Sequence, residues 1–269
     1  MESFRRALSR SAIVAVAGVA CLAATTGSAG AIINGKDATQ SYSFMASIPV
    51  SAPGVGLKDG VCGAALIAPQ WVVTAAHCLN MEIGSIPAGE VRIGSDRRKS
   101  GGTVRKIAQA VIHPRFAQGA PNNNDIALVR LDRPVSYKPI RIAERPGRPG
   151  TPTRIIGFGI TESKRNPADW KMSPRLQELD TRRGAKSECG PGYATKTRLC
   201  TVSRVPDAMA CNGDSGSPQI QRGRNDRWEL IGVTSGPGAA SPSCAEGPGL
   251  YTNVHAYADW IGTTIRKYS

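Results

Sequence analysis

Residues 210–218 have the composition of a turn that presents a nucleophilic hydroxyl. Ser215 lies between Asp214 and Gly216, and Gly213 stands two residues before it. Glycine adopts backbone angles closed to other residues, so Gly213 allows a sharp turn that aims two N–H groups, its own and that of Ser215, at one point where an oxyanion would lie. A serine hydroxyl is a weak nucleophile at neutral pH. This chemistry therefore requires a base and an orienting carboxylate elsewhere in the chain.

Two other segments supply these groups. His77 follows the apolar run 71–73 in a Thr-Ala-Ala-His-Cys segment, and Asp125 precedes the strand-like stretch 126–131. With these flanking residues and the order His, Asp, Ser, the sequence resembles the chymotrypsin/trypsin family of secreted serine proteases, and we expect a bacterial-type member. The resemblance covers the chain from Ile32 to its end.

The resemblance implies a role for each of these residues. His77 would take the proton of Ser215 as general base, and Asp125 would fix the tautomer of the imidazole. The N–H groups of Gly213 and Ser215 would form the oxyanion hole. The chain would then be a serine endopeptidase that hydrolyses peptide bonds through an acyl-enzyme intermediate, without a metal or another cofactor.

The elements that must position these residues are short strands. Apolar stretches alternate with turns rich in Gly and Pro, a pattern typical of β-barrels or sandwiches. The expected strands are 43–50, 62–67, 89–94, 102–112, 153–159, 176–180, 198–203, 217–221, 228–234 and 249–254. A Gly- and Pro-rich loop, 53–60, is expected between the first two strands. Residues 254–268 have apolar side chains at three- and four-residue steps, which indicates a closing amphipathic helix.

Together with the resemblance, this pattern predicts an all-β fold of two packed antiparallel Greek-key β-barrels with a C-terminal α-helix. His77 and Asp125 would lie in the first barrel and Ser215 in the second. The expected divisions are a signal peptide (1–31), the N-terminal barrel (32–135), a linker rich in Pro, Arg and Gly (136–152), the C-terminal barrel (153–253) and the helix (254–269).

The N-terminus has the layout of a secretory signal peptide. Arginines precede an apolar run, 12–24, that is shorter than the roughly 20 residues of a membrane span, and small residues end it at Ala31. Cleavage after Ala31 would expose Ile32, and the resemblance implies that this new amino group pairs with Asp214 and orders the oxyanion hole. We therefore expect an extracellular enzyme that is active on export, with no separate activation peptide and no membrane attachment.

Six cysteines remain once the leader is removed. An even number in an exported chain predicts three disulfides, and the absence of a C-x-x-C pair disfavours a zinc site. Spacing alone leaves the pairing open. The resemblance implies Cys62 with Cys78, Cys189 with Cys200, and Cys211 with Cys244.

The chain is strongly basic, with a formal net charge of +14 and clusters of Lys and Arg at 97–99, 105–106 and 141–165. Such an excess suits anionic cell-wall polymers, acidic substrates or nucleic acid. Aromatic residues rarely interrupt the clusters and no nucleic-acid-binding motif occurs, which favours solvated loops instead. We expect a protein or peptide substrate, a proteinaceous inhibitor as a further partner, no nucleic acid, and a monomer.

Substrate preference depends on the residue six positions before Ser215. Trypsins have an aspartate there that binds Arg or Lys, whereas this chain has Met209 followed by Ala210. An uncharged pocket predicts an apolar or aromatic residue before the scissile bond, because an arginine buried without a partner is costly. The resemblance adds four substrate-binding residues: Ser235, Gly236, Pro237 and Gly249. Pro237 has no N–H, so one hydrogen bond to the substrate main chain is missing.

Three alternatives remain open. Asp207 or Glu246, both near the pocket in sequence, could supply a charge for Arg or Lys specificity. The chain could also be a catalytically silent member that binds cell-surface polymers or proteins through its basic face. Finally, the same triad permits an esterase for small acyl substrates. Comparing peptide with ester turnover would separate these functions.

Overall fold

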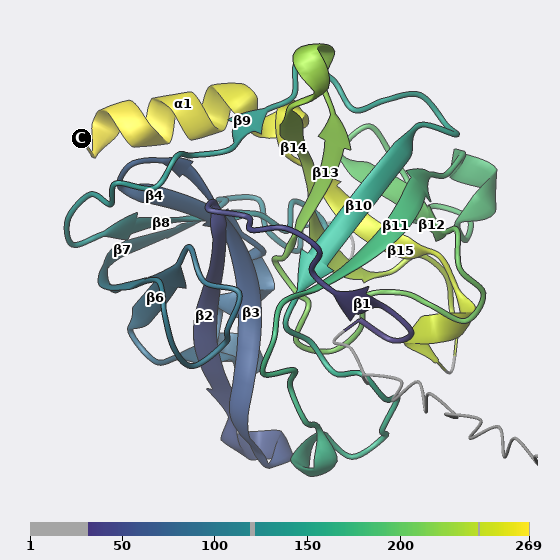
Figure 1. The fold of residues 1–269 in the computed structure, drawn as a ribbon, viewed down its shortest axis with the longest axis horizontal. Coiled ribbons are helices and arrows are strands. Elements are labelled where there is room, and N and C mark those ends of the chain that lie inside the picture. Colours follow the sequence, from purple (N-terminus) through teal and green to yellow (C-terminus); the bar gives the residue numbers. More distant parts are fainter. Residues whose placement is uncertain (1–31, 119–121, 242, 269) are drawn as a thin grey trace, which may run out of the picture.

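The chain folds into two barrels of antiparallel strands that lie side by side, followed by a C-terminal helix (Figure 1). The structure is a computed structural model and describes residues 32–118, 122–241 and 243–268. The expected signal peptide, 1–31, lies outside the described residues. Each barrel is a closed ring of six strands, so the predicted fold is confirmed.

The first barrel has the strand order β2-β3-β4-β8-β7-β6 and closes where β6 pairs with β2. Its strands are β2 (Met45–Ala52), β3 (Leu57–Ala68), β4 (Trp71–Thr74), β6 (Glu90–Ile93), β7 (Thr103–Ile112) and β8 (Ala127–Leu131), and the short β5 (Ile86–Pro87) pairs with β2. The aliphatic side chains of β4 and β8 are buried almost completely. These two paired strands matter for the site, because β4 ends shortly before His77 and β8 begins just after Asp125.

The hairpin between β2 and β3 differs from the prediction. Its ladder continues through Val50–Gly60 and Ala52–Leu57, so half of the expected loop, residues 57–60, is strand. Outside the ladder lie only the 3-10 turn η1 (Pro53–Val55) and Gly56. Gly and Pro indicate that a turn is present, but they do not show how far the backbone hydrogen bonds on either side of it continue.

The second barrel has the order β10-β11-β12-β15-β14-β13 and closes where β13 pairs with β10. Its strands are β10 (Pro152–Gly157), β11 (Gln177–Arg183), β12 (Arg198–Ser203), β13 (Pro218–Arg222), β14 (Trp228–Pro237) and β15 (Gly249–Asn253). Two short segments extend this sheet: β1 (Lys36–Asp37) pairs with β11, and β9 (Arg141–Ile142) pairs with β14. We expected β1 in the first barrel and β9 in the linker, but both strands form hydrogen bonds with the second barrel.

The C-terminal helix begins later than predicted. The 3-10 turn η8 (Val254–Tyr257) precedes α1 (Ala258–Lys267). The ring of Trp260 contacts His113, just beyond β7, at 4.9 Å between ring centroids, so the helix packs on the first barrel. No helix in the described part of the chain is long and apolar enough to span a membrane. The other 3-10 turns are η2 (Ala76–Cys78), η3 (Met81–Ile83), η4 (Pro167–Asp169), η5 (Lys186–Glu188), η6 (Arg224–Asp226) and η7 (Cys244–Glu246).

Three disulfides are present, and they join the cysteines that the resemblance implied. The bridge Cys62–Cys78 connects β3 with the turn that carries His77. The other two are Cys189–Cys200 and Cys211–Cys244. The last bridge ties the segment before Ser215 to η7. The crosslinks therefore brace the segments that carry the candidate catalytic residues.

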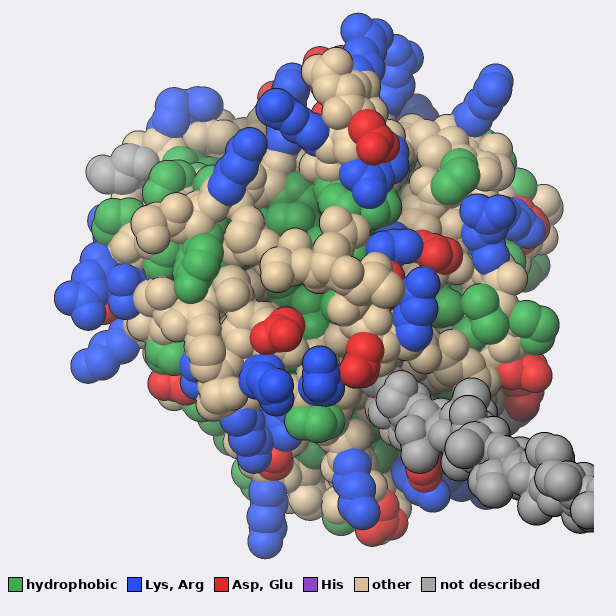
Figure 2. All heavy atoms as spheres, in the orientation of Figure 1, with side chains coloured by type: hydrophobic (Ala, Val, Ile, Leu, Met, Phe, Trp, Pro, Cys, Tyr) green, Lys and Arg blue, Asp and Glu red, His purple; other side chains and the backbone are tan. Residues whose placement is uncertain are grey.

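Basic side chains are distributed widely over the surface. On the face drawn in Figure 2, Lys and Arg lie over both barrels, with Asp and Glu among them. Many of these cations pair with exposed carboxylates, as Arg98 and Lys99 do with Asp59. This distribution fits solvated charges on many loops.

Candidate active site

His77 and Asp125 are joined by two hydrogen bonds. His77 Nδ1 lies 2.8 Å from Asp125 Oδ2, and the backbone N–H of His77 donates to Asp125 Oδ1 at 3.0 Å. An ionised carboxylate only accepts, so Nδ1 carries the proton in the neutral ring and Nε2 is the free base. Burial lowers the pKa of His77, but the charge and hydrogen bond of Asp125 outweigh it and raise the pKa above its usual value.

The position of Asp125 is fixed from the second barrel. Its carboxyl group is fully buried, and Ser235 Oγ on β14 donates to Asp125 Oδ2 at 2.6 Å. Thr252 Oγ1 on β15 donates to the Asp125 backbone carbonyl at 2.7 Å. Asp125 thus precedes a strand of the first barrel, while its carboxylate and backbone carbonyl accept hydrogen bonds from hydroxyls of the second barrel. The acid therefore lies where the two barrels meet.

The loop that carries Ser215 packs against the segment before His77. Gly216 has φ +75°, and a Cβ on it would lie only 2.2 Å from Thr74 Oγ1. Its N–H donates to the Thr234 carbonyl on β14 at 2.8 Å, while the Ser215 carbonyl accepts from Gly63 on β3 at 2.7 Å. Only a glycine permits this close approach. The structure therefore holds the Ser215 loop between the two barrels, next to the segment that leads to His77.

Asp214 lies buried behind Ser215. Its carboxylate accepts hydrogen bonds from the N–H groups of Gly159 at 2.9 Å and Cys211 at 3.0 Å. Burial raises the pKa of Asp214 to about 7, although these two hydrogen bonds act in the opposite direction. The carboxylate lies against Gly159, where a Cβ would come within 2.5 Å of its Cγ and Oδ2. Gly213, with φ +90°, forms the turn before Asp214. Ala31 precedes Ile32 in the full chain, so the Ile32 nitrogen is a peptide nitrogen and the predicted ion pair with Asp214 remains a prediction.

Ile32 itself packs beside the expected pocket. It is 1% exposed and belongs to a buried cluster with Met209 and Tyr251. The next residue, Ile33, donates its N–H to the Met209 carbonyl at 3.1 Å. The segment that would become the new N-terminus is therefore part of the second barrel's core.

A cleft of about 450 Å³ opens at Ser215. All six predicted substrate-binding residues line it: Met209, Ala210, Ser235, Gly236, Pro237 and Gly249. A Cβ on Gly249 would lie 3.0 Å from Met209 Sδ, so the thioether fills the space beneath this glycine. Among the described residues that line the cleft, none is Asp or Glu. Met209, Ala210 and Gly249 thus form an apolar floor, and no carboxylate lies among the described residues of the cleft.

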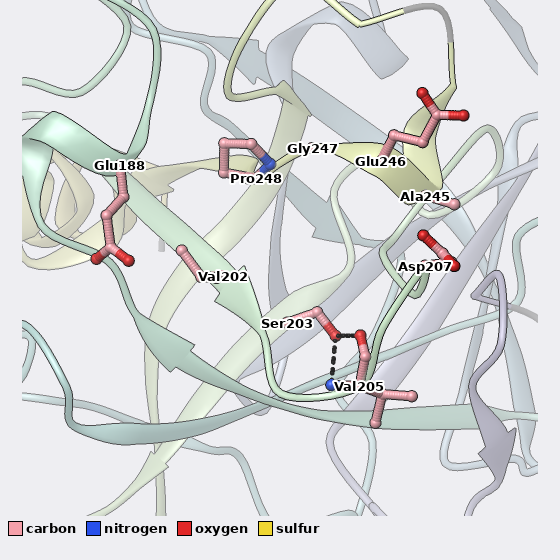
Figure 3. A pocket seen from close by; sticks show the side chains of 9 residues that line it. All are labelled: Glu188, Val202, Ser203, Val205, Asp207, Ala245, Glu246, Gly247 and Pro248. Carbon is pink, nitrogen blue, oxygen red and sulfur yellow. Dashed lines mark hydrogen bonds between the residues drawn. The ribbon is translucent and has the colours of Figure 1, made fainter.

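Asp207 and Glu246 line a different hollow, of about 410 Å³. Figure 3 shows these two side chains on one side of it and Glu188 on the other. Pro248 lines both cavities, but neither Asp207 nor Glu246 lines the cleft at Ser215. The alternative in which Asp207 or Glu246 binds a basic substrate side chain therefore has no support in the geometry. Within the described residues, no group of His, Cys, Asp or Glu is arranged to hold a metal ion.

Comparison with known proteins identifies the family. A family model described as trypsin matches residues 32–261. The chain belongs to the trypsin family.

Relatives and a solved structure support this membership. Trypsin II-P29 of Gallus gallus is 34% identical over 224 residues, which are 80% of this chain and 84% of that protein. Ovochymase of Halocynthia roretzi is 32% identical over 221 residues, 76% of this chain but only 13% of that longer protein. The structure of neuropsin, a serine protease expressed in the limbic system of mouse brain, superposes with a TM-score of 0.70 at 26% identity and covers 87% of this chain and 100% of neuropsin. The chain is therefore a serine endopeptidase that acts on protein substrates.

Several residues of the trypsin-family cleft were not predicted. Gly63 contacts the Ser215 loop from β3, and Asn122, Asn212 and Trp170 line the cleft. The loop 161–171 also contributes Lys164 and Arg165, which the sequence marked only as part of a basic cluster. Gly63 and Asn212 lie in segments that match the family, but no pattern indicated these contacts, because each depends on how distant loops come together at the barrel interface.

Proposed function

We propose that His77, Asp125 and Ser215 form the catalytic triad of this endopeptidase. The hydrogen bond of 2.8 Å between His77 Nδ1 and Asp125 Oδ2 is the observation that carries the proposal. It leaves Nε2 as the base, and the raised pKa of His77 suits an imidazole that must accept a proton near neutral pH.

The proposed reaction is acyl transfer in two steps. Ser215 Oγ attacks the peptide carbonyl as His77 Nε2 takes its proton, and the carbonyl oxygen becomes an oxyanion held by the N–H groups of Gly213 and Ser215. The carbon–nitrogen bond then breaks, and His77 gives the proton to the leaving amine. Water repeats the sequence on the acyl-enzyme and releases the new carboxylate.

The proposed substrate has an apolar or aromatic residue before the scissile bond. The apolar floor made by Met209 and Gly249 supports this preference, as does the lack of a carboxylate among the described cleft residues. An arginine or lysine in such a pocket would be a buried charge without a partner, which costs several kcal/mol. Pro237 lies on the β14 wall without an N–H, so main-chain binding on this side rests on the remaining donors and acceptors.

A cleavage profile of a peptide library, with Ser215→Ala as the control, tests this proposal. We expect cuts after Leu, Phe, Tyr or Met that disappear in the variant. Cuts after Arg or Lys would overturn the pocket assignment. If neither protein cut peptides, a silent binding protein would be the better account, and turnover of esters alone would favour an esterase.

We also propose that the mature protein is secreted, begins at Ile32 and carries an Ile32–Asp214 ion pair. The buried position of Ile32 beside the core of the second barrel supports this start. N-terminal sequencing of exported protein should give Ile32 first, and inactive material with an earlier start would contradict the proposal. A monomer, a proteinaceous inhibitor as partner and a bacterial-type subgroup stay predictions of the same kind.

A further inference from the structure

The rim of the cleft carries two cations from one loop. Loop 161–171 contributes Ser163, Lys164, Arg165 and Trp170 to the lining of the cleft that contains Ser215. No carboxylate is found among the described residues that line this cleft. The rim is therefore positively charged, whereas the floor near Met209 is apolar.

The residues at the two ends of this loop contact the segment just before Ser215, whereas β14 contacts the residue just after it. The Gly216 N–H bonds to Thr234 of β14, the strand that continues into the proposed binding wall 235–237. The Ile160 N–H donates to the Asn212 carbonyl at 2.8 Å. Met172, at the far end of the loop, places its sulfur against Gly213. If the residues before the scissile bond bind β14 and the floor, loop 161–171 borders the space for the residues after it.

Internal hydrogen bonds hold this loop in shape. Trp170 Nε1 donates to the Lys164 carbonyl at 2.8 Å, which fixes the backbone next to both cations. Asn166 Oδ1 accepts from the Ala168 N–H at 3.1 Å and caps η4. A loop that is already ordered loses less conformational entropy when a ligand binds.

The two cations differ in their present partners. Lys164 Nζ lies 3.0 Å from Glu162, but both side chains are more than half exposed, so this pair is weak and a substrate carboxylate can compete for it. Arg165 is exposed and has no ion-pair partner within the described residues. Its guanidinium can bind a carboxylate through two parallel hydrogen bonds.

We propose that Arg165, assisted by Lys164, selects peptides that carry an acidic residue within the first three positions after the scissile bond. The inference rests on the proposed function, because it requires a peptide bound at Ser215. It adds a second requirement to the apolar residue before the bond, and this requirement is electrostatic and sensitive to salt.

Internally quenched peptides test the proposal. All peptides of the first set have the same apolar residue before the scissile bond and carry Glu, Gln or Lys at a single position after that bond. A second set carries Glu two residues before the scissile bond instead. We expect the Glu peptide to exceed the Gln peptide in kcat/KM about threefold to fivefold at low salt, mainly through KM, which is the range of an exposed ion pair. The ratio should approach one at high salt.

Charge reversal identifies the residues responsible. In Arg165→Glu, and more so in the double variant Lys164→Glu/Arg165→Glu, the Lys peptide should become the better substrate. Lys171→Glu is the matched control, because Lys171 is exposed on the same loop but does not line the cleft; its profile should equal that of the unmodified protein. Equal turnover of the Glu and Gln peptides, an unaltered preference in Arg165→Glu, or a preference only for Glu before the bond would overturn the inference. If no peptide of either set were cut, the proposed function would fail as well.

Discussion

At the scale of single residues, Asp125 is the side chain on which the site depends. Its two oxygens accept from the His77 backbone, the His77 ring and Ser235 Oγ. These three hydrogen bonds fix the orientation of the buried carboxylate. The imidazole is oriented by a group that is itself fixed from both barrels.

Replacing Asp125 by Asn should change both rate and pH dependence. We expect kcat to fall on the order of 10⁴-fold, the magnitude found for this change in the family's type enzyme, because the amide favours the wrong tautomer. Activity appears as His77 loses its proton, and without the charge of Asp125 the raised pKa of His77 falls. The rise of kcat/KM should therefore move to lower pH. Asp207→Asn is the control, since Asp207 lies outside the cleft; a pH profile that stays in place in Asp125→Asn would contradict this assignment.

Asp214 predicts a pH-dependent stability of the uncleaved chain. Its folded pKa of about 7 lies above the ordinary aspartate value of 3.8, so between these values the folded state binds more protons than the unfolded state. The contribution of Asp214 to stability is therefore greatest below pH 4 and is lost as pH rises toward and through 7, by on the order of 4 kcal/mol. Asp214→Asn should remove this decline.

Urea unfolding at pH 5 and pH 8, in a Ser215→Ala background, measures this difference. The same comparison for a chain that begins at Ile32 should show a smaller decline or its reversal, because the free ammonium would stabilise the ionised carboxylate. If Asp214→Asn unfolded with the same pH dependence as its parent, the buried carboxylate would not be the cause.

Most of the candidate catalytic residues could be predicted from short sequence motifs. His77, Asp125 and Ser215 stand in segments whose neighbours are as informative as the residues themselves. By contrast, the sequence could not show that Asp207 and Glu246 face a separate hollow, because closeness in sequence to a pocket does not fix the direction of a side chain. For Lys164 and Arg165, the sequence showed only that they belong to a basic cluster, and not that they line the cleft.

At the scale of elements, β3 positions the nucleophile loop. The Gly63 N–H donates to the Ser215 carbonyl, and a Cβ on Gly63 would lie 2.0 Å from Ser217 Oγ and 2.6 Å from its Cα. The loop of the second barrel thus rests directly on the backbone of a first-barrel strand. This contact could not be predicted from the strand pattern, since Gly63 lies between buried strand residues.

Gly63→Ala should push the Ser215 loop away from His77. We expect a loss of about 1–3 kcal/mol in stability from overpacking, and a fall in kcat/KM of about 100-fold, as for a displacement near 1 Å. Gly54→Ala is the control, because no atom lies within 4 Å of a Cβ at that position. Equal activity of the two variants would show that the loop does not depend on β3.

At the scale of the whole molecule, a buried ionic network joins the N-terminal segment to the second barrel. Glu178 on β11 is fully buried and accepts from Tyr42 Oη at 2.7 Å and Thr39 Oγ1 at 2.8 Å. Arg154 on β10 pairs with it at 3.0 Å. Burial is the main reason that the pKa of Tyr42 rises to about 12, so Tyr42 remains a donor to the carboxylate. The network anchors the chain between Ile32 and β2.

Glu178→Gln should destabilise the fold by about 3 kcal/mol, because Arg154 loses its buried partner. Asp180→Asn is the matched control: Asp180 also pairs with Arg154 at 2.7 Å, but its side chain is 47% exposed, so its loss should cost less than about 1 kcal/mol. Urea unfolding of both variants in the Ser215→Ala background provides the comparison. Equal losses would mean that the network contributes no more than a surface ion pair.

The two-barrel architecture was predictable from the sequence. The pairing of β1 and β9 with the sheet of the second barrel was not. The alternation of apolar stretches with Gly- and Pro-rich turns, together with the family resemblance, indicated two barrels and a final helix. Short segments such as β1 and β9 have no periodicity of their own, and their pairing with the other sheet depends on tertiary contacts.

Covalent trapping shows directly whether Ser215 is a nucleophile activated by His77. Protein that begins at Ile32 is treated with a fluorophosphonate, a reagent that requires an activated serine, and the modified residue is identified by peptide mass spectrometry. We expect a single adduct on Ser215 that forms rapidly, forms much more slowly in His77→Ala and is absent in Ser215→Ala. An adduct on another residue, or equal labelling with and without His77, would contradict it.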